Sequence, residues 1–171
     1  MRGHHIILVG FMGSGKTTIG QLLAKRLRRG FIDLDDCIEG AVGKSIAAIF
    51  ADEGEDYFRN LETRCLGDLL SKDLPPAVIA LGGGAFPEQR NRDAITHARA
   101  VTVFLECPLE TLRERCAGLL HRPLAQNATW FTRLHGERLP LYRQADFTVD
   151  TGTGTPEEAA SAIAEAVSNV L

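Results

Sequence analysis

The chain has 171 residues, of which 44% are hydrophobic and 24% charged, and this composition excludes a disordered, collagen-like or membrane-embedded protein. The length suffices for one α/β domain and is too short for two. A net charge of −3 gives the chain no overall attraction for nucleic acid or an anionic membrane, so we expect neither as a partner.

Short apolar runs alternate with amphipathic helical patterns, which predicts βαβ units around a mostly parallel sheet. We expect strands at residues 6–9, 31–33, 77–81, 101–105 and 147–149. We expect helices at residues 16–28, 55–70 and 157–170, the last preceded by Thr155 as a cap and Pro156 in the first turn. Residues 35–54 and 118–129 show no clear period, and irregular connections are expected there.

The cysteines and the N-terminal residues favour a cytoplasmic protein. The four cysteines form no CxxC pair and no zinc-binding pattern with histidine. A chain that can build its own core does not need disulfides, so we expect free thiols in a reducing compartment. The N-terminal segment lacks the long apolar region of a signal peptide, and no apolar run reaches the length of a membrane span.

The strongest motif runs from Gly10 to Thr17 and matches G-x-x-x-x-G-K-[ST], with an apolar strand before it and an amphipathic helix after it. Its glycines let successive backbone N–H groups point at phosphate oxygens, and the helix N-terminus adds positive charge. Lys16 would then reach the β- and γ-phosphates, and the Thr17 hydroxyl would bind Mg²⁺. The alternative, a chance glycine-rich turn, does not account for this context. The motif therefore predicts a nucleotide site.

A pair of carboxylates follows the second expected strand. Asp33 and Asp35 are two residues apart, so along an extended segment both project to one side, beyond the carboxyl end of the strand. One could hold hydrated Mg²⁺ while the other orients or deprotonates an acceptor hydroxyl. Capping of the next helix is the alternative, and for Asp36 alone it is the favoured interpretation.

Glycines and arginines complete the candidate site. Gly82, Gly83 and Gly84 follow the third expected strand, where they would let a ligand approach the backbone closely, although a plain turn is the alternative. Arg59, Arg122 and Arg138 lie in the segments FRNLE, RPL and RLPLY. Arginine binds carboxylate and phosphate bidentately, but each of the three taken alone is more typical of a solvated surface residue.

Taken in order, the segments GFMGSGKTTIG, DLD, FRNLE, LGGGA, RPL and RLPLYRQAD resemble the shikimate kinase family over residues 6–156. The resemblance implies that ATP phosphorylates the 3-hydroxyl of shikimate, giving shikimate 3-phosphate and ADP in chorismate and aromatic amino acid biosynthesis. It implies Mg²⁺ as the cofactor and a three-layer P-loop kinase fold, with a five-stranded parallel sheet in the order 2-3-1-4-5 and helices on both faces. We expect a monomer with one domain over residues 1–171, a substrate-binding segment at about 33–62 and a mobile lid at about 115–129.

The same resemblance implies a role for each matching position. Lys16, Asp35 and Arg122 would be the catalytic residues, with Asp35 binding substrate hydroxyls as base or orienter and Arg122 covering the γ-phosphate from the lid. The nucleotide would be held by Gly13, Ser14, Gly15, Lys16, Thr17, Thr18, Arg115 and Arg122, with Arg115 against adenine. The metal would lie at Thr17 and Asp33. Shikimate would be held by Asp35, Arg59, Gly82, Gly83, Gly84 and Arg138, with the two arginines on its carboxylate.

One departure and two alternatives accompany this interpretation. The lid motif reads RPLA where the family usually has RPLL, so Ala125 should weaken lid packing. Another small kinase of the same fold, acting on gluconate or a nucleoside monophosphate, would share the P-loop but should lack GGG followed by RPL and R-x-P-L-Y. A non-catalytic nucleotide-binding regulatory domain should have lost Asp35, Arg59 or Arg122, and all three are present.

Overall fold

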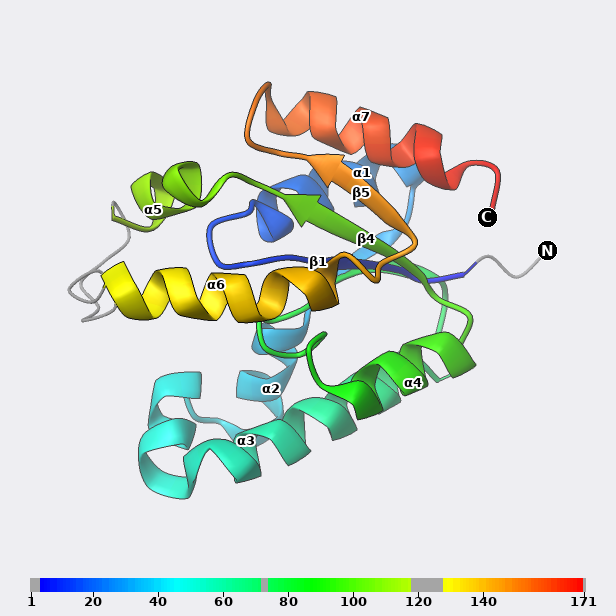
Figure 1. Ribbon diagram of the computed structural model, residues 1–171. Helices are drawn as coiled ribbons and strands as arrows, with labels where there is room; N and C mark the ends of the chain where they lie inside the picture. Colours follow the sequence, from blue (N-terminus) through cyan, green and yellow to red (C-terminus); the bar gives the residue numbers. More distant parts are fainter. Residues whose placement is uncertain (1–3, 72–73, 118–127, 171) are drawn as a thin grey trace.

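A computed structural model describes residues 4–71, 74–117 and 128–170 of the chain. Five parallel strands form one sheet in the order β2-β3-β1-β4-β5 (Figure 1). They are β1 (Ile6–Val9), β2 (Gly30–Asp33), β3 (Ala77–Ala80), β4 (Val101–Glu106) and β5 (Phe147–Asp150). The predicted strand order is confirmed, and each predicted strand is found with its ends shifted by at most one residue.

Helices cover both faces of the sheet. They are α1 (Lys16–Leu27), α2 (Leu34–Val42), α3 (Ile46–Leu69), α4 (Gln89–His97), α5 (Leu109–Ala117), α6 (Ala128–Tyr142) and α7 (Pro156–Val167). Strand β1 shows how the two cores form, because its side chains alternate: Ile7 and Val9 join the core with α2, α3, α4 and α6, while Ile6 and Leu8 join the core with α1 and α7 (Figure 1). Of the helices that the structure describes, none is both long and apolar enough to cross a membrane.

The expectation of an irregular connection at residues 35–54 is wrong, since this stretch is helical. It contains α2 and the first part of α3, separated by Gly43, which ends α2 in a left-handed conformation with φ 71°. Helix α3 has a non-helical residue at Gly54, with φ 84°, so the predicted helix 55–70 is the second part of a kinked helix. Only Leu34 and Ile38 of α2 are buried, and a pattern carried by two residues is too short to show a period.

The topology places the candidate site. Because all five strands are parallel, the segments that follow β1, β2 and β3 emerge at one edge of the sheet. The phosphate-binding motif of residues 10–17, from here on called the P-loop, follows β1. Asp33 ends β2, and the glycine segment Gly82–Gly84 comes directly after β3. The predicted cap at Thr155 is confirmed as a capping box with Glu158, and it starts α7 with Pro156 in the first turn.

Candidate active site

The P-loop has the conformation that its glycines were expected to permit. Gly13 and Gly15 have φ angles of 81° and 92°, in the left-handed region that other residues rarely adopt. Gly15 is the N-cap of α1, so the free N–H groups of the first helical turn face the loop. A methyl group on Gly13 would also lie 3.0 Å from Sγ of Cys116, in α5. The loop is therefore shaped for phosphate by its backbone.

Lys16 is folded into this loop. Its Nζ donates to the backbone carbonyls of Gly10, at 2.8 Å, and Phe11, at 3.0 Å. Removal of the ammonium group from solvent lowers the pKa of Lys16 to about 8, although the nearby Asp35 and Asp33 act in the opposite direction. Negative phosphate oxygens in the loop would favour the charged form again, so nucleotide binding should raise the pKa of this lysine.

Asp33 uses its two carboxylate oxygens for two purposes. Its Oδ2 accepts a hydrogen bond from the Thr17 hydroxyl at 3.1 Å, and its Oδ1 accepts one from the backbone N–H of Asp35 at 3.0 Å as the N-cap of α2. The preference for Asp36 as the cap is therefore wrong, because the helix starts earlier and Asp36 lies exposed in its first turn. Thr17 and Asp33, the two predicted metal residues, thus lie side by side.

Asp35 lies between the P-loop and the glycine segment. Burial raises the pKa of its carboxyl group above the ordinary value, and Asp33 adds to this, while Lys16 opposes it. Its Oδ1 would lie 2.9 Å from a methyl group on Gly82, so a side chain at position 82 would collide with the carboxylate. A carboxylate with a raised pKa is better matched to proton transfer near neutral pH than an ordinary one.

A pocket of about 260 Å³ adjoins the P-loop and is lined by Gly13, Gly15, Thr18 and Arg115 among the predicted residues. Arg115 donates to the backbone carbonyls of Thr151, at 2.8 Å, and Gly13, at 3.3 Å, which holds it at the pocket wall. Thr151, Gly154, Thr155 and Pro156, which lie before and at the start of α7, also line the pocket, and sequence reasoning did not assign them to the site. A larger open depression of about 570 Å³ lies at the amino ends of β4 and β5 and contains none of the predicted residues.

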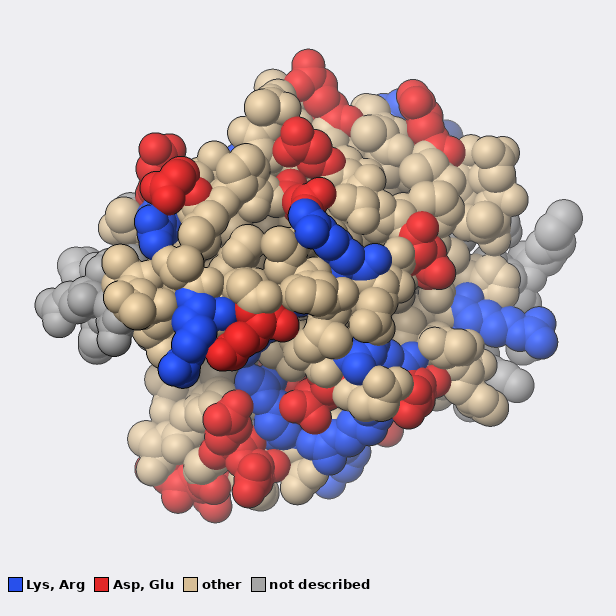
Figure 2. Space-filling model, viewed as in Figure 1, with Lys and Arg blue, Asp and Glu red and all other residues tan. Residues whose placement is uncertain are grey.

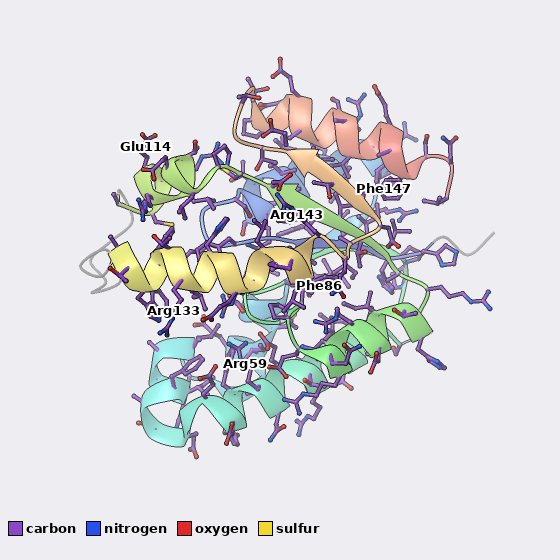
Figure 3. The ribbon with its side chains drawn as sticks, viewed as in Figure 1. Arg59, Phe86, Glu114, Arg133, Arg143 and Phe147 are labelled. Carbon is purple, nitrogen blue, oxygen red and sulfur yellow. The ribbon has the colours of Figure 1, made fainter. Side chains whose placement is uncertain are left out.

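The glycine segment Gly82–Gly84 is where the predicted acceptor residues converge. A methyl group on Gly84 would overlap the guanidinium of Arg59, and one on Gly83 would lie 3.3 Å from Nη1 of Arg138. Arg59 comes from α3 and extends toward α6, which carries Arg138 (Figure 3). The absence of side chains on these glycines therefore lets two arginines and Asp35, from three different helices, lie close to one short stretch of backbone.

Glu62 is a residue that sequence reasoning left without a role. It is 1% exposed and accepts a hydrogen bond from Arg59 at 2.8 Å. Burial raises the pKa of Glu62, while the Arg59 guanidinium opposes the rise. The sequence signal was an acid three residues after an arginine, on the helix face that also carries Phe58 and Leu61. Glu55 also accepts from Nε and Nη2 of Arg59, both at 3.4 Å, so the two glutamates fix the guanidinium and leave one N–H group on each terminal nitrogen for a ligand.

Phe11 connects the P-loop to α6. Its ring meets Phe131 edge-on, with centroids 5.1 Å apart, and His135 in the same way at 5.3 Å. The guanidinium carbon of Arg138 lies 6.0 Å from the centroid of the Phe11 ring. These three contacts come from one face of α6, so the nucleotide loop packs against the same helix face that carries Arg138.

Charge on the surface agrees with a local anion site in an acidic protein. Figure 2 shows acidic and basic side chains interspersed on one face, with Lys and Arg gathered in the band between α6 and α3. Arg122 and Ala125, the two predicted lid residues, lie outside the described residues, so the structure does not place them.

The P-loop lies beside Asp33 and Asp35. Arg59 and Arg138 line the surroundings of the glycine segment at the same edge of the sheet, and we call this the acceptor region. This combination defines the class of P-loop phosphotransferases that act on a small anionic acceptor. The family model described as shikimate kinase matches residues 12–168. The chain therefore belongs to the shikimate kinase family.

Individual relatives agree with this assignment. A shikimate kinase of Nostoc punctiforme is 40% identical over 175 aligned positions, which cover 100% of this chain and 94% of the relative. The structure of a shikimate kinase from Acinetobacter baumannii, in complex with shikimate, has a TM-score of 0.88 and 39% identity and covers 99% of this chain and 96% of that one. A gluconokinase from Sinorhizobium meliloti reaches a TM-score of 0.63 at 20% identity, with coverage of 99% and 96%, and this likeness shows the fold alone.

Proposed function

We propose that this chain transfers the γ-phosphate of ATP to the 3-hydroxyl of shikimate. The observation that carries the proposal is the convergence of Asp35, Arg59 and Arg138 on the glycine segment, next to a P-loop. The related Acinetobacter baumannii structure contains shikimate, a small carboxylate with three hydroxyl groups, which matches two arginines and one carboxylate in chemistry.

The acceptor would be held by its charge at one end and its hydroxyl groups at the other. Arg59 and Arg138 would bind the carboxylate, and the Gly82–Gly84 backbone would let the ring approach without a clash. Asp35 would accept a hydrogen bond from a ring hydroxyl and, in its ionised form, take the proton or orient the oxygen for attack. Proton transfer of this kind contributes about 10²- to 10⁴-fold to the rate.

The donor would be bound mainly by backbone. The N–H groups of residues 13–18 would hold the phosphates, and Lys16 would turn from the Gly10 and Phe11 carbonyls to the β- and γ-phosphates. Arg115 would lie against the adenine in the pocket of about 260 Å³. Phosphoryl transfer depends on in-line positioning and on positive charge around the moving group, and both are available here.

The Thr17 hydroxyl and the Asp33 carboxylate fit Mg²⁺, because both are oxygen donors and they already lie 3.1 Å apart. Bound together with ATP, Mg²⁺ supplies charge neutralisation at the phosphates. Few protein ligands are needed, since Mg²⁺ in kinases keeps water molecules and binds substrate phosphates.

The proposed function also assigns roles to two segments of the chain, an oligomeric state and a location. Residues 33–62 would form the substrate-binding segment and residues 115–129 the lid, whose Arg122 is assigned from the RPL motif alone. The chain would act as a monomer. A cytoplasmic location is supported by the four cysteines, all of which are free thiols.

The test is a coupled assay of ADP release with shikimate, gluconate, AMP and CMP as acceptors, run with and without EDTA. We expect turnover with shikimate alone, lost when Mg²⁺ is chelated. Turnover with gluconate or a nucleotide in place of shikimate would contradict the proposal, and so would activity that survives chelation. Light scattering coupled to size exclusion tests the monomer.

A further inference from the structure

Tyr142 is a buried polar side chain that the proposed mechanism does not use. It is the last residue of α6 and is 1% exposed. Its ring stacks on Phe104 of β4, with centroids 5.3 Å apart and an angle of 23° between the planes. A tyrosine anchored in this way on a central strand presents its hydroxyl group from a fixed position.

The hydroxyl group contacts both parts of the acceptor region. It donates a hydrogen bond to the backbone carbonyl of Gly83, in the middle of the glycine segment. Arg138 lies four residues earlier on the same face of α6, and its guanidinium is close enough to the Tyr142 oxygen to oppose the rise in the pKa of the hydroxyl group. A methyl group on Gly83 would lie 3.3 Å from Nη1 of Arg138 and 3.5 Å from the Tyr142 hydroxyl, so the three groups meet at one point.

Arg138 is also restrained on its other side, where its guanidinium carbon lies 6.0 Å from the centre of the Phe11 ring. The arginine is thus held between an aromatic ring of the P-loop and the hydroxyl of Tyr142. The Gly83 carbonyl is satisfied by that hydroxyl, and without it the carbonyl would be an acceptor for the Arg138 N–H groups themselves.

We propose that Tyr142 is a positioning residue for acceptor binding: its hydroxyl joins the Gly83 carbonyl to the Arg138 guanidinium and so keeps the arginine directed at the substrate carboxylate. The inference rests on the proposed function, because it assigns the carboxylate to Arg138. The hydroxyl competes with Arg138 for the Gly83 carbonyl. It donates to the carbonyl and accepts one guanidinium N–H group, which leaves the other N–H groups free for the carboxylate.

Burial raises the pKa of Tyr142 to about 12, so the hydroxyl keeps its proton throughout the range of an enzyme assay. It therefore remains a donor to Gly83 at every pH at which the enzyme would be measured.

The first experiment is Tyr142→Phe, which removes the hydroxyl and keeps the ring on Phe104. We expect the KM for shikimate to rise about tenfold, as for the loss of one hydrogen bond to a charged group, while kcat and the KM for ATP change less than twofold. The control is Ser168→Ala, which removes an exposed hydroxyl group that donates to the backbone carbonyl of Glu165 after the end of α7, away from the acceptor region. It should leave all three constants unchanged.

A double-mutant cycle separates positioning from a general structural effect. In the Arg138→Ala background, Tyr142→Phe should raise the KM for shikimate no further, because the residue through which it acts is absent. An equal rise in both backgrounds, or an unchanged KM in the single variant, would overturn the inference. KM does not depend on the fraction of folded enzyme, so partial unfolding does not hide the result. Failure of the unaltered chain to phosphorylate shikimate would instead contradict the proposed function.

Discussion

The nucleotide region and the acceptor region of this site are built in different ways. The nucleotide region is continuous in sequence, since residues 10–18 supply a loop and a helix start whose backbone N–H groups would face the phosphates of a bound nucleotide. The acceptor region is assembled from α2, α3, α6 and the segment after β3, and it depends on side chains in close contact with glycines. A backbone site recognises what all nucleotides share, whereas a side-chain site recognises one acceptor.

The largest expected effect comes from Asp35, which lies where the two regions meet. Asp35→Asn should lower kcat by about 10³-fold, because the amide cannot accept a proton, and it should leave the affinity for ATP nearly unchanged. Steady-state kinetics and a nucleotide-binding titration measure the two. Asp36→Asn is the control, as its side chain is exposed in the first turn of α2. Near-normal turnover in Asp35→Asn would remove this residue from the chemistry.

A smaller effect, confined to the acceptor region, is expected from Gly84→Ala. The added methyl group would overlap the Arg59 guanidinium and displace it, so the KM for shikimate should rise about 30-fold, equivalent to about 2 kcal/mol. The KM for ATP should stay the same. Gly67→Ala offers a comparison within α3, because a methyl group there meets nothing within 4 Å. Equal changes in both KM values would show that the two regions are not separable.

The pH dependence of the two KM values should also distinguish the regions, and here the KM for ATP is the one that changes. The pKa of Lys16 is lowered to about 8, and phosphates bind the charged form, so affinity for ATP is full only well below pH 8. As the pH rises through 8 the lysine deprotonates, and the KM for ATP should increase by up to about tenfold per pH unit. The KM for shikimate should stay flat over pH 7.5–9.5, because arginine side chains are the proposed ligands of its carboxylate and arginine does not deprotonate in proteins. A flat KM for ATP would contradict the assignment.

The smallest effect is expected at Asp33, where capping and metal binding are combined. Asp33→Asn keeps a good N-cap for α2, so the melting temperature should change little. Loss of the negative charge beside Thr17 should raise the Mg²⁺ concentration needed for half-maximal activity by about threefold to tenfold. Titrating Mg²⁺ at fixed ATP measures this, with thermal unfolding as the check on the cap. An unchanged Mg²⁺ requirement would remove Asp33 from the metal site.

The same contrast explains what could be predicted from the sequence. Strands β1, β3 and β4 were predictable because each is a short, nearly continuous apolar run, and the P-loop because its function is encoded in one local motif. Asp35, Arg59 and Arg138 were assigned through family motifs, and the structure brings them together at the glycine segment. That meeting depends on the packing of three helices, which no local pattern reports.

Other features could not be predicted from the sequence for the same reason. Glu62 and Tyr142 are polar residues whose roles follow from burial beside arginines that lie three or four positions away on their own helices. Thr151, Gly154, Thr155 and Pro156 line the pocket beside the P-loop only because the end of β5 and the start of α7 lie next to that loop in the folded chain. The helical content of residues 35–54 was missed because α2 and the start of α3 bury few side chains, so neighbouring elements stabilise them more than any pattern of their own.

The contact between Phe11 and α6 has a thermodynamic consequence. One rigid helix touches the phosphate loop through Phe131 and His135 and carries the arginine assigned to the acceptor. If occupation of the loop shifts that helix, it changes the affinity for the acceptor by some factor, and the acceptor must change the affinity for nucleotide by the same factor. A measurement of nucleotide binding with and without acceptor therefore gives the coupling free energy between the two regions, which the contacts of Phe11 with α6 would transmit.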